Sequence, residues 1–253
     1  MRSTRSGAGP VTMLLLTLAL GTAGLFAATP ADAGAGGKPR VGECRALTAA
    51  EAAAATNTTA PTGCRRAHDD RVIAVPDLPT GVSWTDLSDK QIVKQGVKAC
   101  APVLHTVLGH GDKLRDRSAY DFVFFQPTDA QIAAGARWLR CDVVLRQGKA
   151  LADLPTDATR ALPAPPLKDR VARCLKGPSL ITTTCSSRHS YRATGAFTMA
   201  GASFPGRTAL VHAGHANCPS RVSSRSYVFD WKPKLFWTLV HDRTVVCFTK
   251  TTG

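Results

Sequence analysis

The chain has 253 residues, of which 44% are hydrophobic and only 6% aromatic, with a formal net charge of +14 at pH 7. This length and composition allow one large domain or two small ones, each with a small packed core. Beyond the N-terminal region, no stretch reaches the ~20 apolar residues that a membrane-spanning helix needs, so further spans are excluded.

Residues 1–33 predict a signal peptide. Arg2 and Arg5 give a basic start, residues 11–28 are apolar, and Ala31-Asp32-Ala33 offers small residues to a signal peptidase. We expect cleavage after Ala33; the alternative is a segment kept as an uncleaved anchor. All eight cysteines follow this segment, and an even number in an exported protein predicts disulfides.

The first half of the mature chain predicts a small α+β module over residues 41–145, after a flexible lead at 34–40. Thr48 and Glu51 form a capping-box signature for a short helix. The other expected elements are a strand at 71–76, a helix at 84–108 capped by Asp86 or Ser88, and a hairpin of strands at 121–127 and 138–145.

A proline-rich linker is predicted at 146–170, where four prolines favour a semi-extended chain. Residues 171–253 then predict a second module with the same order of elements in shortened form. Its expected elements are a strand at 191–199, a helix at 208–218, and strands at 227–233 and 244–248.

The two halves share a pattern of residues as well as an order of elements. Cys-x-x-x-His occurs at Cys64–His68 and at Cys185–His189, with an offset of 121. At an offset of 106, Pro127 aligns with Pro233, Arg137 with Arg243, and Cys141 with Cys247. We therefore expect an α+β fold of two tandem disulfide-stapled modules, each a small antiparallel sheet packed on one main helix.

These motifs resemble the bacterial septum formation domain family, whose members are exported or membrane-anchored proteins of actinobacterial type. The first half carries the resemblance and the second half is a divergent copy, with His241-Asp242-Arg243 where the family has Gly-Asp-Arg. The resemblance implies an association with division or the cell envelope, and it brings no known reaction or catalytic residue. The residues that carry it are Val41-Gly42-Glu43-Cys44, Cys64, His68, Cys100-Ala101-Pro102, Phe125-Gln126-Pro127-Thr128, Gly135-Ala136-Arg137 and Cys141.

The four cysteines of each half allow three pairings. We favour the first with the second and the third with the fourth. A closed loop of twenty to forty residues stabilises by roughly 3–4 kcal/mol in the chain-entropy model. The favoured pairs are Cys44–Cys64, Cys100–Cys141, Cys174–Cys185 and Cys218–Cys247.

The repeated histidines have two interpretations. His68 and His189 can each hydrogen-bond the backbone beside a disulfide, or they can belong to a binding site, for which Arg137 and Arg243 are further candidates because they also recur. Zinc at the Cys-x-x-x-His motif is the alternative chemistry, and it would make the protein an exported zinc-dependent hydrolase. We expect neither metal nor cofactor. Structural zinc ligands usually come in closely spaced pairs, and each of the remaining cysteines has no second cysteine close to it in the sequence.

Charge differs sharply between the halves. Residues 34–145 carry 14 Lys+Arg and 12 Asp+Glu, whereas residues 146–253 carry 16 against 5, a net charge of +11. In an exported protein this favours an anionic envelope polymer, a membrane surface or an envelope protein as partner, and disfavours nucleic acid. No catalytic motif is present, so we expect a non-enzymatic cell-envelope protein; the sequence indicates no oligomeric state.

Overall fold

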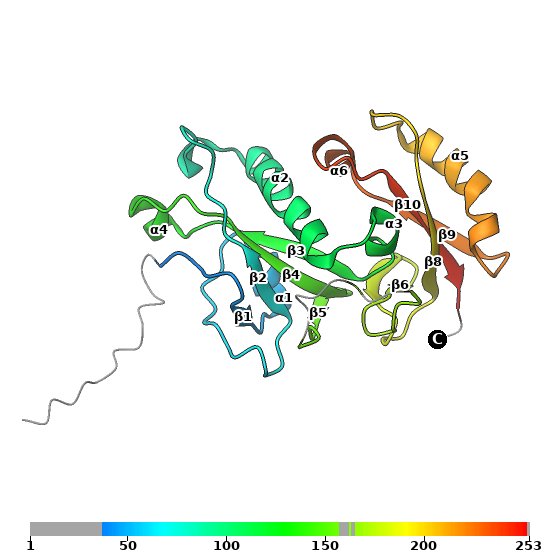
Figure 1. The fold of residues 1–253 in the computed structure, drawn as a ribbon, viewed down its shortest axis with the longest axis horizontal. Coiled ribbons are helices and arrows are strands. Elements are labelled where there is room, and N and C mark those ends of the chain that lie inside the picture. Colours follow the sequence, from blue (N-terminus) through cyan, green and yellow to red (C-terminus); the bar gives the residue numbers. More distant parts are fainter. Residues whose placement is uncertain (1–36, 157–161, 163–164, 252–253) are drawn as a thin grey trace, which may run out of the picture. The chain divides into compact units, whose positions relative to one another are not determined.

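The computed structural model describes residues 37–156, 162 and 165–251. The predicted signal peptide with its cleavage site at Ala33 lies outside the described residues, as does the start of the 34–40 lead. The described part is an α+β fold with two antiparallel sheets and four disulfides (Figure 1). None of its helices is both long and apolar enough to cross a membrane.

The first sheet has the strand order β1-β2-β4-β3, with β5 beside the end of β4, and all its pairs are antiparallel. The hairpin predicted from the sequence is confirmed as β3 and β4, which pair with Phe124 opposite Cys141. Its strands are β1 (Cys44–Arg45), β2 (Asp70–Ala74), β3 (Tyr120–Phe125), β4 (Arg140–Gln147) and β5 (Ala150–Ala152).

The main helix of the first half, α2 (Asp89–Leu108), lies along one face of this sheet (Figure 1). It begins later than the predicted 84–108, because Ser88 forms a capping box with Gln91 and a separate 3₁₀ turn, Trp84–Asp86, precedes it. Gly109, with a φ of 63°, ends the helix as expected. Val93 of this helix is 46% exposed.

Three short helices complete the first half: α1 (Ala49–Ala53), α3 (Asp112–Arg115) and α4 (Asp129–Ala133). The capping box predicted at Thr48 and Glu51 is confirmed at α1. A turn was expected between the two hairpin strands, and α4 forms there instead, because Thr128 and Gln131 make a second capping box.

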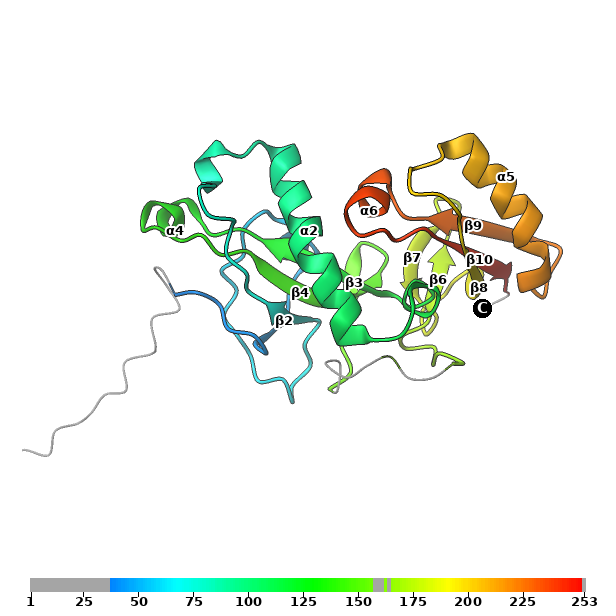
Figure 2. The ribbon, with the colours of Figure 1, turned by 45° about the horizontal axis from the view of Figure 1, so that its top comes forward.

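The second sheet has the strand order β7-β6-β8-β10-β9, again all antiparallel. Helix α5 (Arg207–Asn217) packs beside it, and α6 (Lys234–Leu239) joins β9 to β10 (Figure 2). The elements α5, β8, β9 and β10 were predicted from the sequence, whereas α6 and the β6–β7 hairpin were not. The strands are β6 (Arg173–Lys176), β7 (Ile181–Thr184), β8 (Tyr191–Thr198), β9 (Tyr227–Trp231) and β10 (Thr244–Lys250).

Each half holds two disulfides, and none joins the halves. The S–S bonds link Cys44 with Cys64, Cys100 with Cys141, Cys174 with Cys185, and Cys218 with Cys247. These are the pairs favoured from the sequence. In each half one disulfide ties the helix to an inner strand of the sheet: Cys100 of α2 is bonded to Cys141 of β4, and Cys218 at the end of α5 is bonded to Cys247 of β10.

The helix of each half meets its sheet through a glycine four residues before the helix cysteine. A Cβ atom on Gly96 would lie 2.6 Å from Cζ of Phe124, and one on Gly214 would lie 2.6 Å from Cζ of Phe229. Both phenylalanines stand opposite a disulfide cysteine, Phe124 opposite Cys141 and Phe229 opposite Cys247. The missing side chain is therefore what lets each helix approach its ring.

The halves are packed against each other, and all described residues belong to one compact unit. The ring centroids of Phe122 and Phe236 are 6.1 Å apart, and the amide of Ala119 donates to the carbonyl of Val171. This corrects the expectation of an unpacked linker at 146–170. The apolar side chains of that segment supply the burial: Leu154, Leu162 and Leu167 are at most 5% exposed, and β4 and β5 extend into it.

Candidate functional site

The two Cys-x-x-x-His motifs fold in the same way. Nδ1 of His68 lies 2.8 Å from the carbonyl oxygen of Arg66, and Nδ1 of His189 lies 2.7 Å from that of Ser187. A carbonyl oxygen only accepts, so Nδ1 carries the hydrogen in both rings. The histidine thus closes the turn that follows its cysteine, which is a structural reason for its presence in both halves.

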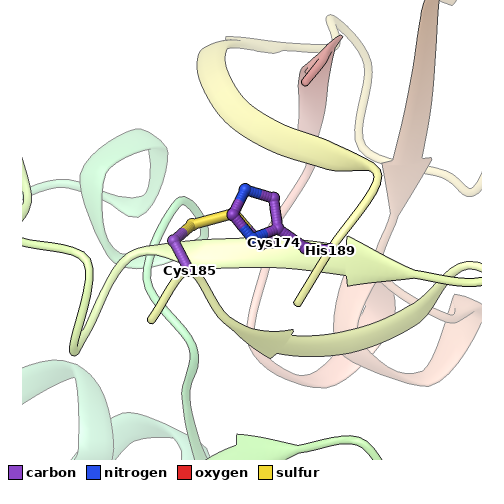
Figure 3. A group of neighbouring side chains, drawn as sticks. All are labelled: Cys174, Cys185 and His189. Carbon is purple, nitrogen blue, oxygen red and sulfur yellow. A yellow bond between two sulfur atoms is a disulfide. The ribbon is translucent and has the colours of Figure 1, made fainter. Parts of the chain in front are cut away.

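Around the second motif, the structure brings together three atoms that could bind a metal. The sulfurs of Cys174 and Cys185 and one ring nitrogen of His189 lie within 4.8 Å of one another (Figure 3). The two sulfurs are bonded to each other in this structure. Because zinc binds thiolates, only reduction of this disulfide would make the cluster a ligand set.

The two arginines singled out by sequence have separate environments. Arg137 donates from Nη2 to the carbonyl oxygens of Leu78 at 3.2 Å and Pro79 at 2.7 Å, so its guanidinium holds a loop of the first half. Arg243 precedes β10, and its carbonyl oxygen accepts from the amide of Met199. Neither arginine lines the pocket that contains His189.

A cationic pocket of about 450 Å³ lies at the second motif. Its charged side chains are Lys176, Arg188 and Lys250, and no carboxylate lines it. Among the residues that the structure describes, none of these three cations forms an ion pair. Uncompensated cations in one depression attract anions, so this arrangement is suited to binding an anion.

Hydroxyl groups add hydrogen-bond donors to the cationic pocket. Ser190 and Thr251 line it, and Oγ1 of Thr251 is buried with no hydrogen-bond partner among the described residues. The backbone holds both residues in place, because the amide of Ser190 donates to Leu175 and the amide of Thr251 donates to Ser190. An unsatisfied buried hydroxyl is costly, and an anion in the pocket would accept its hydrogen bond.

A second polar depression, of about 360 Å³, lies where the halves meet. Its cations are all compensated: Lys232 is paired with Asp116 at 3.2 Å, Arg146 with Asp121 at 2.8 Å, and Arg173 with Asp230. Burial raises the pKa of Asp116 to about 6. The Lys232–Asp116 pair crosses from one half to the other, so we assign this cluster to holding the halves together.

The first sheet contains a buried charge network. Asp70 in β2 and Asp142 in β4 are fully buried, and Nε of Arg140 donates to Oδ2 of Asp142 at 2.7 Å. Burial, together with the neighbouring Asp142 carboxylate, raises the pKa of Asp70 to about 9. Asp70 is therefore protonated at neutral pH, and its carboxyl group can donate to the neighbouring carboxylate of Asp142. With no exposed surface, this pair lies inside the sheet and cannot reach a substrate.

His189 was predicted from the sequence as a candidate binding residue, but the residues around it were not. Lys176, Lys250 and Ser190 are far apart in the chain and meet because β6, β8 and β10 are neighbours in the sheet. Only the charge of the second half, +11, indicated them. The repeated Gly-x-x-x-Cys spacing at Gly96 and Gly214 is a further signal, and it could have located the helix–sheet contact.

Comparison with known families gives one match. A family model described as septum formation matches residues 81–229, which are 149 of the 253 residues, or 59% of the chain. The match runs from the first half into the second. Comparison with curated proteins and with solved structures finds no match.

Proposed function

The chain belongs to the septum formation family, and from this we propose that it is an exported, non-enzymatic cell-envelope protein that acts in septum formation by binding an anionic surface. Family membership supports a role associated with cell division. Four disulfides are typical of a protein outside the cytoplasm, where thiols become oxidised. Export itself, through the predicted signal peptide, is part of the proposal.

We further propose that the halves are two tandem copies of one module of actinobacterial type, with copies at 41–145 and 171–253. Three matched features support this: the disulfide pattern, the turn closed by His68 and His189, and the glycine–phenylalanine contact. The strand orders β2-β4-β3 and β8-β10-β9 also correspond.

One observation carries the binding function: the cationic pocket of Lys176, Arg188, His189 and Lys250 contains no carboxylate. The acidic side chains of the second half that form ion pairs bind cations outside this pocket: Asp169 is paired with Arg192 and Asp230 with Arg173. The positive charge at the pocket is thus available to an anionic envelope polymer, a membrane surface or an acidic envelope protein.

Binding to isolated wall fragments and to vesicles containing an anionic lipid, at low and high salt, tests this function. We expect binding that weakens as salt rises, because exposed charges are screened within ~10 Å at 0.1 M. The matched control replaces Lys90, Lys94 and Lys98 by glutamine; these are exposed cations of α2, and their loss should leave binding unchanged. The proposal is rejected if the protein does not bind at low salt, or if its binding does not change with salt concentration.

The zinc-dependent hydrolase is the second candidate, and the cluster of Cys174, Cys185 and His189 favours it. Titration of free thiols in the denatured, unreduced protein separates the two. We expect no free thiol and no bound zinc; four or more free thiols would support the hydrolase and contradict our proposal.

A further inference from the structure

One end of the second sheet collects the cationic side chains of its strands. In an antiparallel sheet with the order β7-β6-β8-β10-β9, the ends of β6 and β10 lie beside the starts of β7, β8 and β9. Lys176 ends β6 and Lys250 ends β10, while His189 and Ser190 lead into β8.

Another cation joins them beside the edge strand. The amide of Lys250 donates to the carbonyl oxygen of Ser226 at 3.1 Å, and the preceding residue, Arg225, is exposed. No acidic residue occurs in 176–181, 187–191, 223–227 or 248–251, the segments that form this end of the sheet. We call these segments the basic end of the second sheet. All the lysine, arginine, aspartate and glutamate side chains of the basic end are therefore cationic.

The basic end also carries an exposed apolar turn. Residues 177–180 connect β6 to β7, and Leu180 and Ile181 are 37% and 40% exposed. They are neighbours in the chain and are two of the four large hydrophobic side chains exposed in the described part of the protein. A hydrated anionic polymer would give such side chains no apolar environment, whereas a bilayer interface would.

The backbone conformation of this turn is unfavourable for leucine. Leu180 has a φ of 51°, in the left-handed region where glycine and asparagine are favoured and leucine is strained. Gly177, with a φ of 67°, starts the same turn. A strained position that keeps a large, exposed apolar side chain is better explained by what that side chain contacts than by the turn itself.

We propose that the basic end of the second sheet docks on a bilayer containing anionic phospholipid, with Leu180 and Ile181 entering the interface. Lys176, Arg188, Arg225 and Lys250 meet the headgroup phosphates, and the cationic pocket holds one of them. Basic residues next to an apolar segment are the usual combination for binding a negatively charged leaflet. This inference rests on the proposed function and specifies which anionic surface is bound and by which face.

Two pairs of substitutions test this proposal. They are made in the mature chain that is predicted to start at Gly34, which contains all the described residues. Lys176→Gln/Lys250→Gln should weaken binding to phosphatidylcholine vesicles with 30% phosphatidylglycerol about 30-fold, since each lysine near an anionic surface contributes ~1 kcal/mol and 1.4 kcal/mol is tenfold. Leu180→Asn/Ile181→Thr should weaken it about tenfold, because part of both side chains is already buried.

Matched controls come from the first half. Lys90→Gln/Lys94→Gln removes two exposed cations, and Val93→Gln removes an exposed apolar side chain, all from α2. Neither should change vesicle binding. A thermal melt checks each fold; Leu180→Asn should melt no lower than the parent, because asparagine accepts the left-handed backbone.

A tryptophan at position 180 reports insertion directly. Leu180→Trp should gain emission that shifts to the blue on anionic vesicles and is quenched by brominated lipid, and neither change should occur with neutral vesicles. If both double variants bind vesicles as well as the parent does, the proposal that this face docks on the bilayer is overturned. Salt-sensitive binding to wall fragments without binding to vesicles also overturns it but leaves the proposed function standing. If neither surface is bound, both proposals fail.

Discussion

Replacement of Asp70 by asparagine tests the buried carboxyl pair of the first sheet. Asp70 has its ordinary pKa of 3.8 in the unfolded chain and a pKa of about 9 in the fold. Because the folded pKa is raised, its contribution to stability is complete below about pH 4 and is lost as pH rises towards 9. Linkage gives a slope of up to ~1.4 kcal/mol per pH unit, so this group alone lowers the free energy of unfolding by about 4 kcal/mol between pH 5 and pH 8.

An asparagine at this position cannot ionise, and its amide group can donate to the neighbouring carboxylate of Asp142. The free energy of unfolding of Asp70→Asn should therefore exceed that of the parent at pH 8 and match it near pH 4. Guanidinium chloride unfolding with the disulfides intact, at pH 4, 5, 6.5 and 8, measures the difference. Subtraction of the two curves removes the titration of all other groups.

Asp142→Asn is the control, because it alters the other member of the pair. It removes the charge that Arg140 binds and leaves that guanidinium, 2% exposed, without its carboxylate. We expect a loss of roughly 3–5 kcal/mol at both ends of the pH range. Parallel curves for the parent and Asp70→Asn would refute the assignment of a buried, protonated Asp70.

Three further predictions concern packing and cross-links. Gly96→Ala should destabilise the fold by about 1–2 kcal/mol despite the better helix propensity of alanine, because its Cβ would overlap the ring of Phe124. In a Phe124→Leu background the same change should be neutral or stabilising. Chemical denaturation measures both, and Gly111→Ala is the control because nothing lies within 4 Å of a Cβ at that position. Lys232→Met should cost about 3 kcal/mol by leaving Asp116 buried without its partner, and Asp116→Asn in the same chain should recover part of that loss in thermal melts. Cys218→Ser/Cys247→Ser opens a loop with a sequence separation of 29 and should cost roughly 3–4 kcal/mol, whereas a loss below 1 kcal/mol would contradict a stabilising cross-link.

Sequence reasoning found the elements whose signals are local. The capping box at Thr48, the end of the main helix at residue 108 and the hairpin of β3 and β4 were all predicted, because caps and patterns of apolar residues act within a few positions. The order of the cysteines was also informative, because it recurs in both halves. The family assignment from motifs agrees with the family match.

Features that depend on distant residues were not predicted. Leu162 looked like part of an extended linker, but its burial is decided by contact with α2, where its amide donates to Leu108. The cationic pocket joins Lys176 and Lys250, 74 positions apart, through the order of strands in a sheet. Helix α6 was missed because a six-residue helix has no measurable periodicity, and its position follows from the burial of Trp237.

The disulfides join cysteines that are consecutive along the chain, so no cross-link encloses or interlocks with another. For a chain that enters an oxidising compartment with its N-terminus first, each cysteine meets its correct partner before the next pair arrives. Simple oxidation in order of emergence then produces the native set, without reshuffling of wrong bonds. Four cysteines per half would otherwise allow three connectivities each, and the linear order removes that choice.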